Sequence, residues 1–327
     1  MTRLGYHASH EQYSPSELLQ YVELAEAAGF QSASCSDHFH PWTEAQGQSG
    51  FAWSWLGAAL HATGLSLGTV NAPGARYHPA IIAQAAATLA EMFPARFWFA
   101  IGSGEALNEA ITGAPWPLKS ERNARLKECA DVMRALWRGE TVTHRGLVTV
   151  VEAKLYTLPE MPPPLFGAAL TPETAEFVGG WADGLMTLGG PVDKIRKIID
   201  AFREGGGHGK PVYIQHTLSW APHEEEALRG AHHQWRFSAL GPELLPALRT
   251  PAEFEAATEF VSPNDVANGV RISSDLAQHA AWLHEYVELG IDAVFLFNVN
   301  RGQRAFIDAF GERVLPEITR ESAAATR

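Results

Sequence analysis

An acid, two imidazoles and an indole lie within six consecutive residues, from Asp37 to Trp42. The preceding residues 30–36 read as a strand that enters a core, and Pro41 keeps either regular element from continuing. A strand that ends in titratable side chains and then turns into a loop is the usual arrangement of a barrel active site. A buried Asp–His pair in a structural network is an equal alternative, and this stretch alone does not decide between the two.

Polar side chains also follow three other segments that we expect to be strands, at residues 3–8, 65–69 and 96–101. They are Glu11 after the first segment, Val70-Asn71 after the second, and Ser103, Glu105 and Asn108 after the third. If these strands are neighbours in a barrel, two carboxylates, an imidazole and an indole meet at one mouth. Such convergence from separate strands is what an active site requires.

Each of these residues also has a structural interpretation. Glu11 could only stabilise the positive end of a nearby helix, and His40 is better read as a solvated loop histidine. Trp42 could be core packing, although an indole at a strand mouth is well placed to stack on a planar ligand. The small residues before Glu105 would let a ligand approach the backbone, but Gly102-x-Gly104 alone is a weak signal.

The elements that must position these residues alternate between strand and helix. The βα pattern occurs four times before residue 141, is interrupted by a hairpin at residues 141–157 with its turn at Arg145-Gly146, and then resumes. Residues 223–259 read as a second, mostly helical insertion. The apolar residues 292–299 predict a strand that is buried on both faces.

Outside the hairpin we count seven clear strands and a weak eighth near residues 270–272. Eight βα units in 327 residues predict a (β/α)8 TIM barrel with two insertions, as one domain over residues 1–320 and a flexible tail at 321–327. An open doubly wound sheet is less consistent with the sequence, because no glycine fingerprint follows the first strand.

Composition excludes several classes of protein. The formal net charge is −12 and no dense cluster of Lys and Arg is present, so we expect no nucleic-acid partner. Two cysteines give no disulfide framework, and neither a signal peptide nor a membrane-spanning run is apparent. We therefore expect a soluble cytoplasmic protein that acts on a small molecule.

The chain resembles the deazaflavin (coenzyme F420)-dependent glucose-6-phosphate dehydrogenase group of the bacterial luciferase-like superfamily of TIM barrels. The similarity is specific over the first half and thinner as far as residue 313. Its motifs are Leu4-Gly5-Tyr6, Ser36-Asp37-His38-Phe39 with Pro41-Trp42, Arg76-Tyr77 with Pro79-Ala80, and Gly102-x-Gly104-Glu105-Ala106-Leu107-Asn108-Glu109.

The resemblance implies an oxidoreductase with a flavin-type ring, coenzyme F420 or FMN, at the barrel mouth. It assigns His38 as the base that takes the substrate's hydroxyl proton, Glu105 as the acid near the ring nitrogen, and Trp42 as a residue that holds the reacting species. A base and an acid on opposite sides of a planar acceptor let hydride and proton move without building charge.

The resemblance also assigns binding residues. It implies that the cofactor contacts Asp37, Val70, Asn71, Gly104, Asn108, Ala169 and Thr171, and it points to Glu11 for the substrate. A non-proline cis peptide typical of the superfamily would fall within residues 69–71. We expect no metal ligand, and by resemblance we expect a homodimer.

The chain departs from the sugar-phosphate enzymes where they hold phosphate. Their two lysines and an arginine are matched here by Gly190, Leu245 and Gly269, so we expect that glucose 6-phosphate is not the substrate. The segment at residues 69–76 is one residue shorter, and Ala169-Leu170-Thr171 replaces a glycine pair that supports a deazaflavin. Arg249 or Arg271 could substitute for these phosphate ligands, although we do not expect it, and the cofactor is either FMN or F420.

Two other functions compete with a flavin-type oxidoreductase. A metal-dependent hydrolase on the same barrel would use His38, His40 and His216 as ligands, but further strand-end ligands are hard to find. A non-catalytic flavin-binding relative would bind the cofactor without turnover. A bound chromophore separates the oxidoreductase from the hydrolase.

Overall fold

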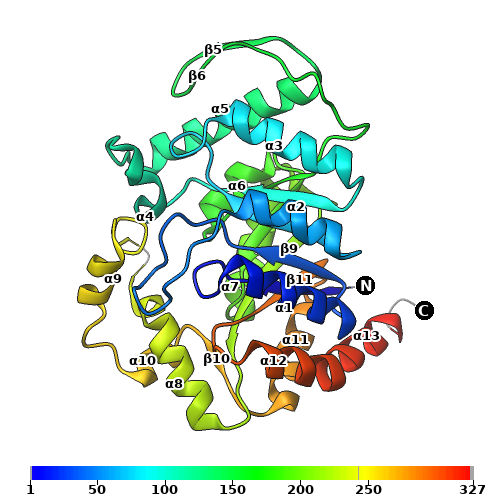
Figure 1. Ribbon diagram of the computed structural model, residues 1–327, viewed down its shortest axis with the longest axis vertical. Coiled ribbons are helices and arrows are strands. Elements are labelled where there is room, and N and C mark those ends of the chain that lie inside the picture. Colours follow the sequence, from blue (N-terminus) through cyan, green and yellow to red (C-terminus); the bar gives the residue numbers. More distant parts are fainter. Residues whose placement is uncertain (1, 242, 325–327) are drawn as a thin grey trace.

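The computed structural model describes residues 2–241 and 243–324, with side chains as far as residue 319. Its parallel strands close into a barrel in which β1 pairs with β2 on one side and with β11 on the other, as Figure 1 shows. In spatial order the barrel strands are β1 (Arg3–Ala8), β2 (Ser32–Cys35), β3 (Ser66–Asn71), β4 (Phe97–Ile101), β7 (Leu165–Ala168), β8 (Gly184–Leu188), β9 (Val212–Ser219) and β11 (Ala293–Asn298).

Helices surround the barrel and follow its strands. The outer helices are α1 (Pro15–Ala27), α2 (Ala52–Ala62), α3 (Pro79–Met92), α5 (Lys119–Trp137), α6 (Pro172–Gly179), α7 (Val192–Phe202), α11 (Leu276–Glu288), α12 (Gln303–Ala309) and α13 (Leu315–Ala324). Short turns of 3-10 type (Ala110–Thr112, Arg236–Ala239) and π type (Arg203–Gly207, Phe310–Val314) extend some of them. Ser14 caps α1 in a capping box with Glu17, as its sequence indicates.

The predicted TIM barrel is confirmed, but the weak eighth strand is not part of it. Strand β10 (Arg271–Ile272) pairs only with β9, outside the closed ring, and the eight barrel strands come from the stronger segments. The third strand continues through Asn71, so Val70 and Asn71 belong to β3 and do not follow it. Residues 321–324 of the predicted tail extend helix α13, and residues 325–327 lie outside the described residues.

Large aromatic side chains fill the amino-terminal half of the barrel. The rings of Phe166 and Tyr213 stack with centroids 4.3 Å apart, and Trp98 lies 5.0 Å from Tyr213 and 5.2 Å from Phe295. Gly68 on β3 makes room for the indole, because a Cβ there would lie 2.3 Å from Trp98 Cδ2. This plug closes one end of the barrel and leaves the carboxyl end for a ligand.

The two insertions leave the barrel at different places. The hairpin of β5 (Val142–Arg145) and β6 (Thr149–Ala153) lies over α5 at the top of Figure 1, and its turn is residues 146–148 rather than Arg145-Gly146. The helical insertion contains α8 (Glu224–Trp235), α9 (Pro251–Ala257) and α10 (Pro263–Ala267) and packs near the short helix α4 (Ala106–Glu109). The described part of the chain contains no helix with the length and apolar character that crossing a membrane requires.

One backbone prediction is wrong. All peptide bonds between described residues are trans, including those of residues 69–71 where a cis bond was expected. Thr69, Val70 and Asn71 instead continue the regular parallel pairing of β3 with β4.

Candidate active site

Asp37, at the end of β2, is a hub of hydrogen bonds within the protein. Its Oδ2 atom accepts from Asn71 Nδ2 at 2.7 Å and from Trp53 Nε1 at 3.2 Å. Its Oδ1 atom accepts from Tyr77 OH at 2.9 Å and lies 3.5 Å from Arg76 Nη2. These donors come from β3, α2 and the loop before α3, so Asp37 ties the mouth of the barrel together. The implied contact of Asp37 with a ring stays a prediction.

His38 and Glu11 lie next to each other, from the ends of β2 and β1. The distance from His38 Nε2 to Glu11 Oε1 is 3.5 Å, and His38 Nδ1 has no hydrogen-bond partner within the described chain. Glu11 Oε2 accepts from Ser36 Oγ at 2.5 Å and from Ser9 Oγ at 2.9 Å. Burial opposes ionisation of Glu11, but His38 and Ser36 outweigh it and hold the pKa of Glu11 below its usual value. Glu11 is therefore a carboxylate that can stabilise a charged His38.

Glu105 caps the amino terminus of the short helix α4 and carries no cap hydrogen bond. Burial raises the pKa of Glu105 to about 7, the charge of His38 acts against that rise, and Glu11 and Glu109 add to it. Gly104 has a φ of 77°, and a Cβ there would lie 2.9 Å from Glu109 Cγ, so the turn needs glycine. His38 and Glu105 are thus within electrostatic reach of each other at one mouth.

Trp42 joins this group to the helical insertion. Its ring lies 5.0 Å from the ring of His38 and stacks on Phe237 with a centroid distance of 4.6 Å and an angle of 15°. Phe254 and Leu107 complete an apolar cluster around it, and Trp42 is 7% exposed. Trp42 is therefore part of a packed core and also borders His38, and its stacking on a planar ligand stays a prediction.

Asn108 and His40 hold the loop that follows β2. Asn108 Oδ1 accepts from the backbone N–H of Phe39 at 2.9 Å and of His40 at 3.4 Å. The ring of His40 makes a 2.8 Å hydrogen bond, through Nδ1, with the carbonyl of Leu107. These hydrogen bonds hold the backbone that directly follows His38.

The inner wall of the mouth includes residues that the sequence did not single out. Tyr213 faces the barrel interior, so the alternation of β9 turns Gln215 and Thr217 to the same side, where both are half-buried. Val70 of β3 and Ala168 of β7 pack against the aromatic cluster in the barrel interior. Leu188 of β8 faces the same side by strand alternation and is exposed. The alternating pattern of residues 212–219 is the signal that could have found Gln215 and Thr217.

The two predicted binding residues after β7 are not equivalent. Ala169 is 1% exposed and its side chain packs in the outer core, so only its backbone could face a ligand. Thr171 is exposed and caps helix α6, accepting from Thr174 N at 3.3 Å. Thr171 therefore lies at the amino terminus of α6, a kind of position at which backbone N–H groups can bind phosphate.

The ligand set that a hydrolase would need is not assembled. His216, a residue of β9, has a buried side chain whose Nδ1 atom lies 3.0 Å from Tyr286 OH. Burial lowers the pKa of His216 to about 3. Within the described residues no group of three or more His, Cys, Asp or Glu side chains could hold a metal ion. His38 and His40 have the partners given above.

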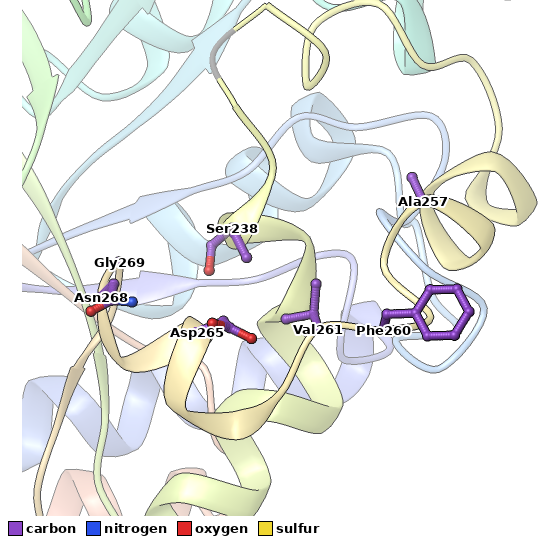
Figure 2. Close-up of a pocket in the computed structure, with 8 residues that line it drawn as sticks. Ser238, Ala257, Phe260, Val261, Asp265, Asn268 and Gly269 are labelled. Carbon is purple, nitrogen blue, oxygen red and sulfur yellow. The ribbon is translucent and has the colours of Figure 1, made fainter.

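A hollow of about 480 Å³ lies within the helical insertion, as Figure 2 shows, between the turn Arg236–Ala239, α9 and α10. Its charged lining residue, Asp265, accepts from Ser262 in the capping box that begins α10, and Phe260 points away from the hollow. The groups that could perform acid–base chemistry lie at the barrel mouth instead.

His38, Glu11 and Glu105 meet at the mouth of a parallel (β/α)8 barrel, the usual place of an active site in this fold, so fold and site indicate a TIM-barrel enzyme. Residues 1–293 match the family described as Luciferase-like monooxygenase, and the chain belongs to this family of oxidoreductases.

The similarity to individual proteins extends over nearly the whole chain. The F420-dependent glucose-6-phosphate dehydrogenases of Beutenbergia cavernae and Mycolicibacterium fortuitum are each 36% identical, over 97% of this chain and 98% of theirs. The structure of an F420-dependent secondary alcohol dehydrogenase in complex with an F420-acetone adduct superposes with a TM-score of 0.89 at 32% identity, over 97% of this chain and 99% of that one. The F420-dependent tetrahydromethanopterin reductase of Methanopyrus kandleri, 18% identical, shares the fold with a TM-score of 0.77 over 96% and 99%.

Proposed function

We propose that this protein oxidises a small uncharged alcohol with a flavin-type cofactor, coenzyme F420 or FMN, at the carboxyl mouth of the barrel. One observation carries the proposal: His38 lies 3.5 Å from a carboxylate, Glu11, and within electrostatic reach of an acid of raised pKa, Glu105. The names of the relatives support it, since they include dehydrogenases that depend on F420 and one with a secondary alcohol substrate.

The residues at the mouth fit a flat heteroaromatic ring. Val70, Ala168 and Leu188 offer apolar side chains on one wall, and Gln215 with Thr217 offers polar groups on the next. Asn71, which follows the interior-facing Val70 on β3, donates to Asp37, and its buried Oδ1 atom has no hydrogen-bond partner in the described chain. A bound flavin-type ring would supply the two-electron acceptor for a hydride.

The protein's own groups account for the protons. The alcohol loses a hydride from carbon and a proton from oxygen, and His38 takes that proton at the ring nitrogen left free, Nδ1. Glu11 stabilises the resulting imidazolium from the side of Nε2. Glu105 holds a proton near neutral pH, because its pKa is raised to about 7. Base and acid therefore have separate roles at one pH.

The substrate is proposed to lack a phosphate. Gly190, Leu245 and Gly269 bring no charge to the places where sugar-phosphate enzymes were expected to have cations. Arg271, a potential substitute, is engaged by Glu285 at 3.1 Å and stacks over Trp282. A doubly charged phosphate needs charge-assisted donors, which these places do not supply.

The test is turnover by the protein loaded with F420 or FMN, with propan-2-ol or glucose 6-phosphate as substrate. We expect oxidation of the alcohol and none of the sugar phosphate. His38→Ala and Glu105→Gln should each lose roughly 100-fold or more in kcat while they still bind the cofactor, in line with the usual worth of general acid–base groups.

Two exposed residues provide matched controls, His61→Ala for the histidine and Glu44→Gln for the glutamate. Both should keep wild-type kcat. Wild-type turnover by His38→Ala or Glu105→Gln would remove the assigned role, and efficient oxidation of glucose 6-phosphate would refute the substrate class. Cofactor binding without reduction by any alcohol would favour a non-catalytic relative.

A further inference from the structure

His7 lies in the interior of the barrel, at the bottom of the mouth. It is two residues beyond Gly5 on β1, where a Cβ would lie 2.5 Å from the Phe295 ring of the aromatic plug. Side chains alternate along a strand, so His7 faces the same interior and lies nearer the carboxyl end. It is 4% exposed, and the centroids of its ring and of the Phe297 ring on β11 are 4.5 Å apart. His7 therefore forms part of the floor below a ligand at the mouth.

One ring nitrogen of His7 is engaged within the protein and the other is open. Nδ1 lies 2.9 Å from Oγ of Ser34, the residue that pairs with His7 on β2. Nε2 has no hydrogen-bond partner among the residues that the structure describes. Each nitrogen of an imidazole either donates or accepts a hydrogen bond. The ring therefore keeps one unused hydrogen-bonding group, on the side remote from its attachment to β1.

The imidazole of His7 is neutral near pH 7. Burial lowers the pKa of His7 to about 4, the charge of Glu11 acts against that shift, and the charge of His38 adds to it. His7 is thus within electrostatic reach of the proposed base and of the carboxylate beside it. A neutral imidazole can hold a hydroxyl or a carbonyl oxygen, whereas a phosphate or carboxylate is best held by charged donors. The open nitrogen of His7 therefore suits an uncharged oxygen.

A second open polar group lines the same stretch of wall. Thr217 on β9 pairs with Phe297 on β11, and Phe297 in turn contacts His7 on β1. Thr217 is half-buried, and its hydroxyl has no hydrogen-bond partner in the described part of the chain. Val70 of β3 and Ala168 of β7, on the opposite side of the barrel, are apolar. A pocket with one apolar side and a few open polar groups on the other fixes the orientation of a small ligand.

We propose that His7 Nε2 and the Thr217 hydroxyl bind a second, uncharged oxygen of the substrate, so that the alcohol oxidised here also carries another hydroxyl or a carbonyl group. This inference rests on the proposed function and names its substrate class more closely. His38 takes the proton of the reacting hydroxyl, while His7 selects the substrate by its other oxygen.

The physical reason for such a preference is the cost of leaving polar groups without partners. A simple alcohol at the mouth excludes water from His7 and Thr217 and offers them no hydrogen bond in return. A substrate with a second oxygen replaces the excluded water. The alcohol with two oxygens should therefore react with the higher kcat/KM.

The test compares alcohols that share the reacting group and differ by one hydroxyl. Propane-1,2-diol is paired with propan-2-ol, and butane-1,3-diol with butan-2-ol, so that the second hydroxyl lies one or two carbons from the reacting carbon. The protein is loaded with F420 or FMN, and the ratio of kcat/KM for diol over simple alcohol is measured. We expect a ratio of about 10 or more in the wild type for at least one pair, in line with one hydrogen bond to a group that is otherwise unpaired.

The variants separate the two nitrogens of His7. The amide of His7→Asn lies near the position of Nδ1 and can still contact Ser34, whereas the amide of His7→Gln reaches the position of Nε2. His7→Asn should lower the ratio by about 10-fold, His7→Gln should lower it less, and Thr217→Val should lower it in the same direction. The controls are His61→Asn and Thr141→Val, both exposed, which should keep the wild-type ratio.

A second measurement needs no turnover. The protein is labelled with [15N]histidine, and the ring signals of His7 are identified by their absence from the spectra of His7→Asn and His7→Gln. Titration with propane-1,2-diol or butane-1,3-diol should shift the Nε2 signal of His7 to saturation, and the matching simple alcohol should shift it less. The ring of His61 provides the internal control.

The proposal is overturned if the wild type does not prefer either diol, or if His7→Asn and Thr217→Val both keep the wild-type ratio. A loss of stability in His7→Asn without a change in the ratio would likewise leave His7 with only its contact to Ser34. If His7→Asn does not fold, Thr217→Val decides, because its hydroxyl holds no other part of the described chain.

Failure to oxidise any alcohol would instead refute the proposed function. The NMR titration is then made on the protein without turnover, and a His7 signal that responds equally to diol and simple alcohol overturns the subsite.

Discussion

Replacing Glu105 by glutamine should stabilise the protein above neutral pH while it removes turnover. Burial raises the pKa of Glu105 from 4.5 to about 7, so the folded protein keeps this proton more tightly than the unfolded chain does. Protonated Glu105 therefore contributes its whole share to the free energy of unfolding below pH 4.5, and this share is lost as the pH rises through about 7. At about 1.4 kcal/mol for each pH unit, the cost of ionised Glu105 at pH 8.5 approaches about 3 kcal/mol.

Solvent reduces this figure, because Glu105 is half-buried and water at the mouth screens its charge. We therefore expect about 1–2 kcal/mol, or roughly 2–3 °C in Tm for a chain of this size. Thermal unfolding of the wild type and Glu105→Gln without cofactor is compared at pH 5 and pH 8.5, with Glu44→Gln as the control. The increase in Tm of Glu105→Gln over the wild type should be small at pH 5 and larger at pH 8.5. An equal effect at both pH values, or a loss at pH 8.5, would refute the cause given for the raised pKa.

Two further predictions concern residues that build the site. Gly68→Ala should lower the free energy of unfolding by about 2–3 kcal/mol, because the new Cβ would lie 2.3 Å from Trp98 Cδ2. Gly302→Ala is the control, since a Cβ there meets open space. Equal stability of the two variants in denaturant unfolding would contradict the packing argument. Asp37→Asn should cost about 2–4 kcal/mol in the same assay, since an amide cannot accept all the bonds from Trp53, Asn71 and Tyr77, and the exposed Asp131→Asn should cost little.

The barrel itself was predictable because its signals are local. Alternating strands and helices and the apolar residues 293–298 specify parallel strands, and a chain of this length closes them into one ring. The error was to count the weak segment near residues 270–272 as the eighth strand of the ring, which the stronger segments complete without it. Strand β10 extends only two residues beside the end of β9, and β pairing between distant segments is not encoded in either segment alone.

The acid and base were predictable for a similar reason, since a titratable side chain just after a strand must lie at the barrel mouth. His38 and Glu105 satisfy that rule. The groups that shift the pKa values of the two carboxyls come from elsewhere in the chain: His38 and Ser36 lower that of Glu11, while burial raises that of Glu105 and His38 opposes the rise. The distances between these groups depend on how the barrel strands are staggered, and neither amino-acid composition nor the periodicity of apolar residues reveals that stagger.

Other roles depended on the direction of a side chain. Asn108 was assigned to the cofactor by resemblance, and its Oδ1 atom holds the backbone of Phe39 and His40. Asp37 was assigned similarly, and Tyr77, 40 residues later, is one of the donors that occupy it. Both residues hold the polypeptide around His38 in the folded chain, and their contacts with a cofactor stay predictions.

Glu11 and Glu105 show how one kind of side chain can take two roles at a single mouth. Both lose solvent on folding, and burial alone would raise the pKa of each. Hydroxyl donors and the imidazole reverse that effect for Glu11, whereas Glu105 has neither a hydroxyl donor nor a cap hydrogen bond. His38 lowers the pKa of both carboxyls, and it lies 3.5 Å from Glu11. The difference in partners, not in residue type, therefore separates the stabilising carboxylate from the proton-holding acid.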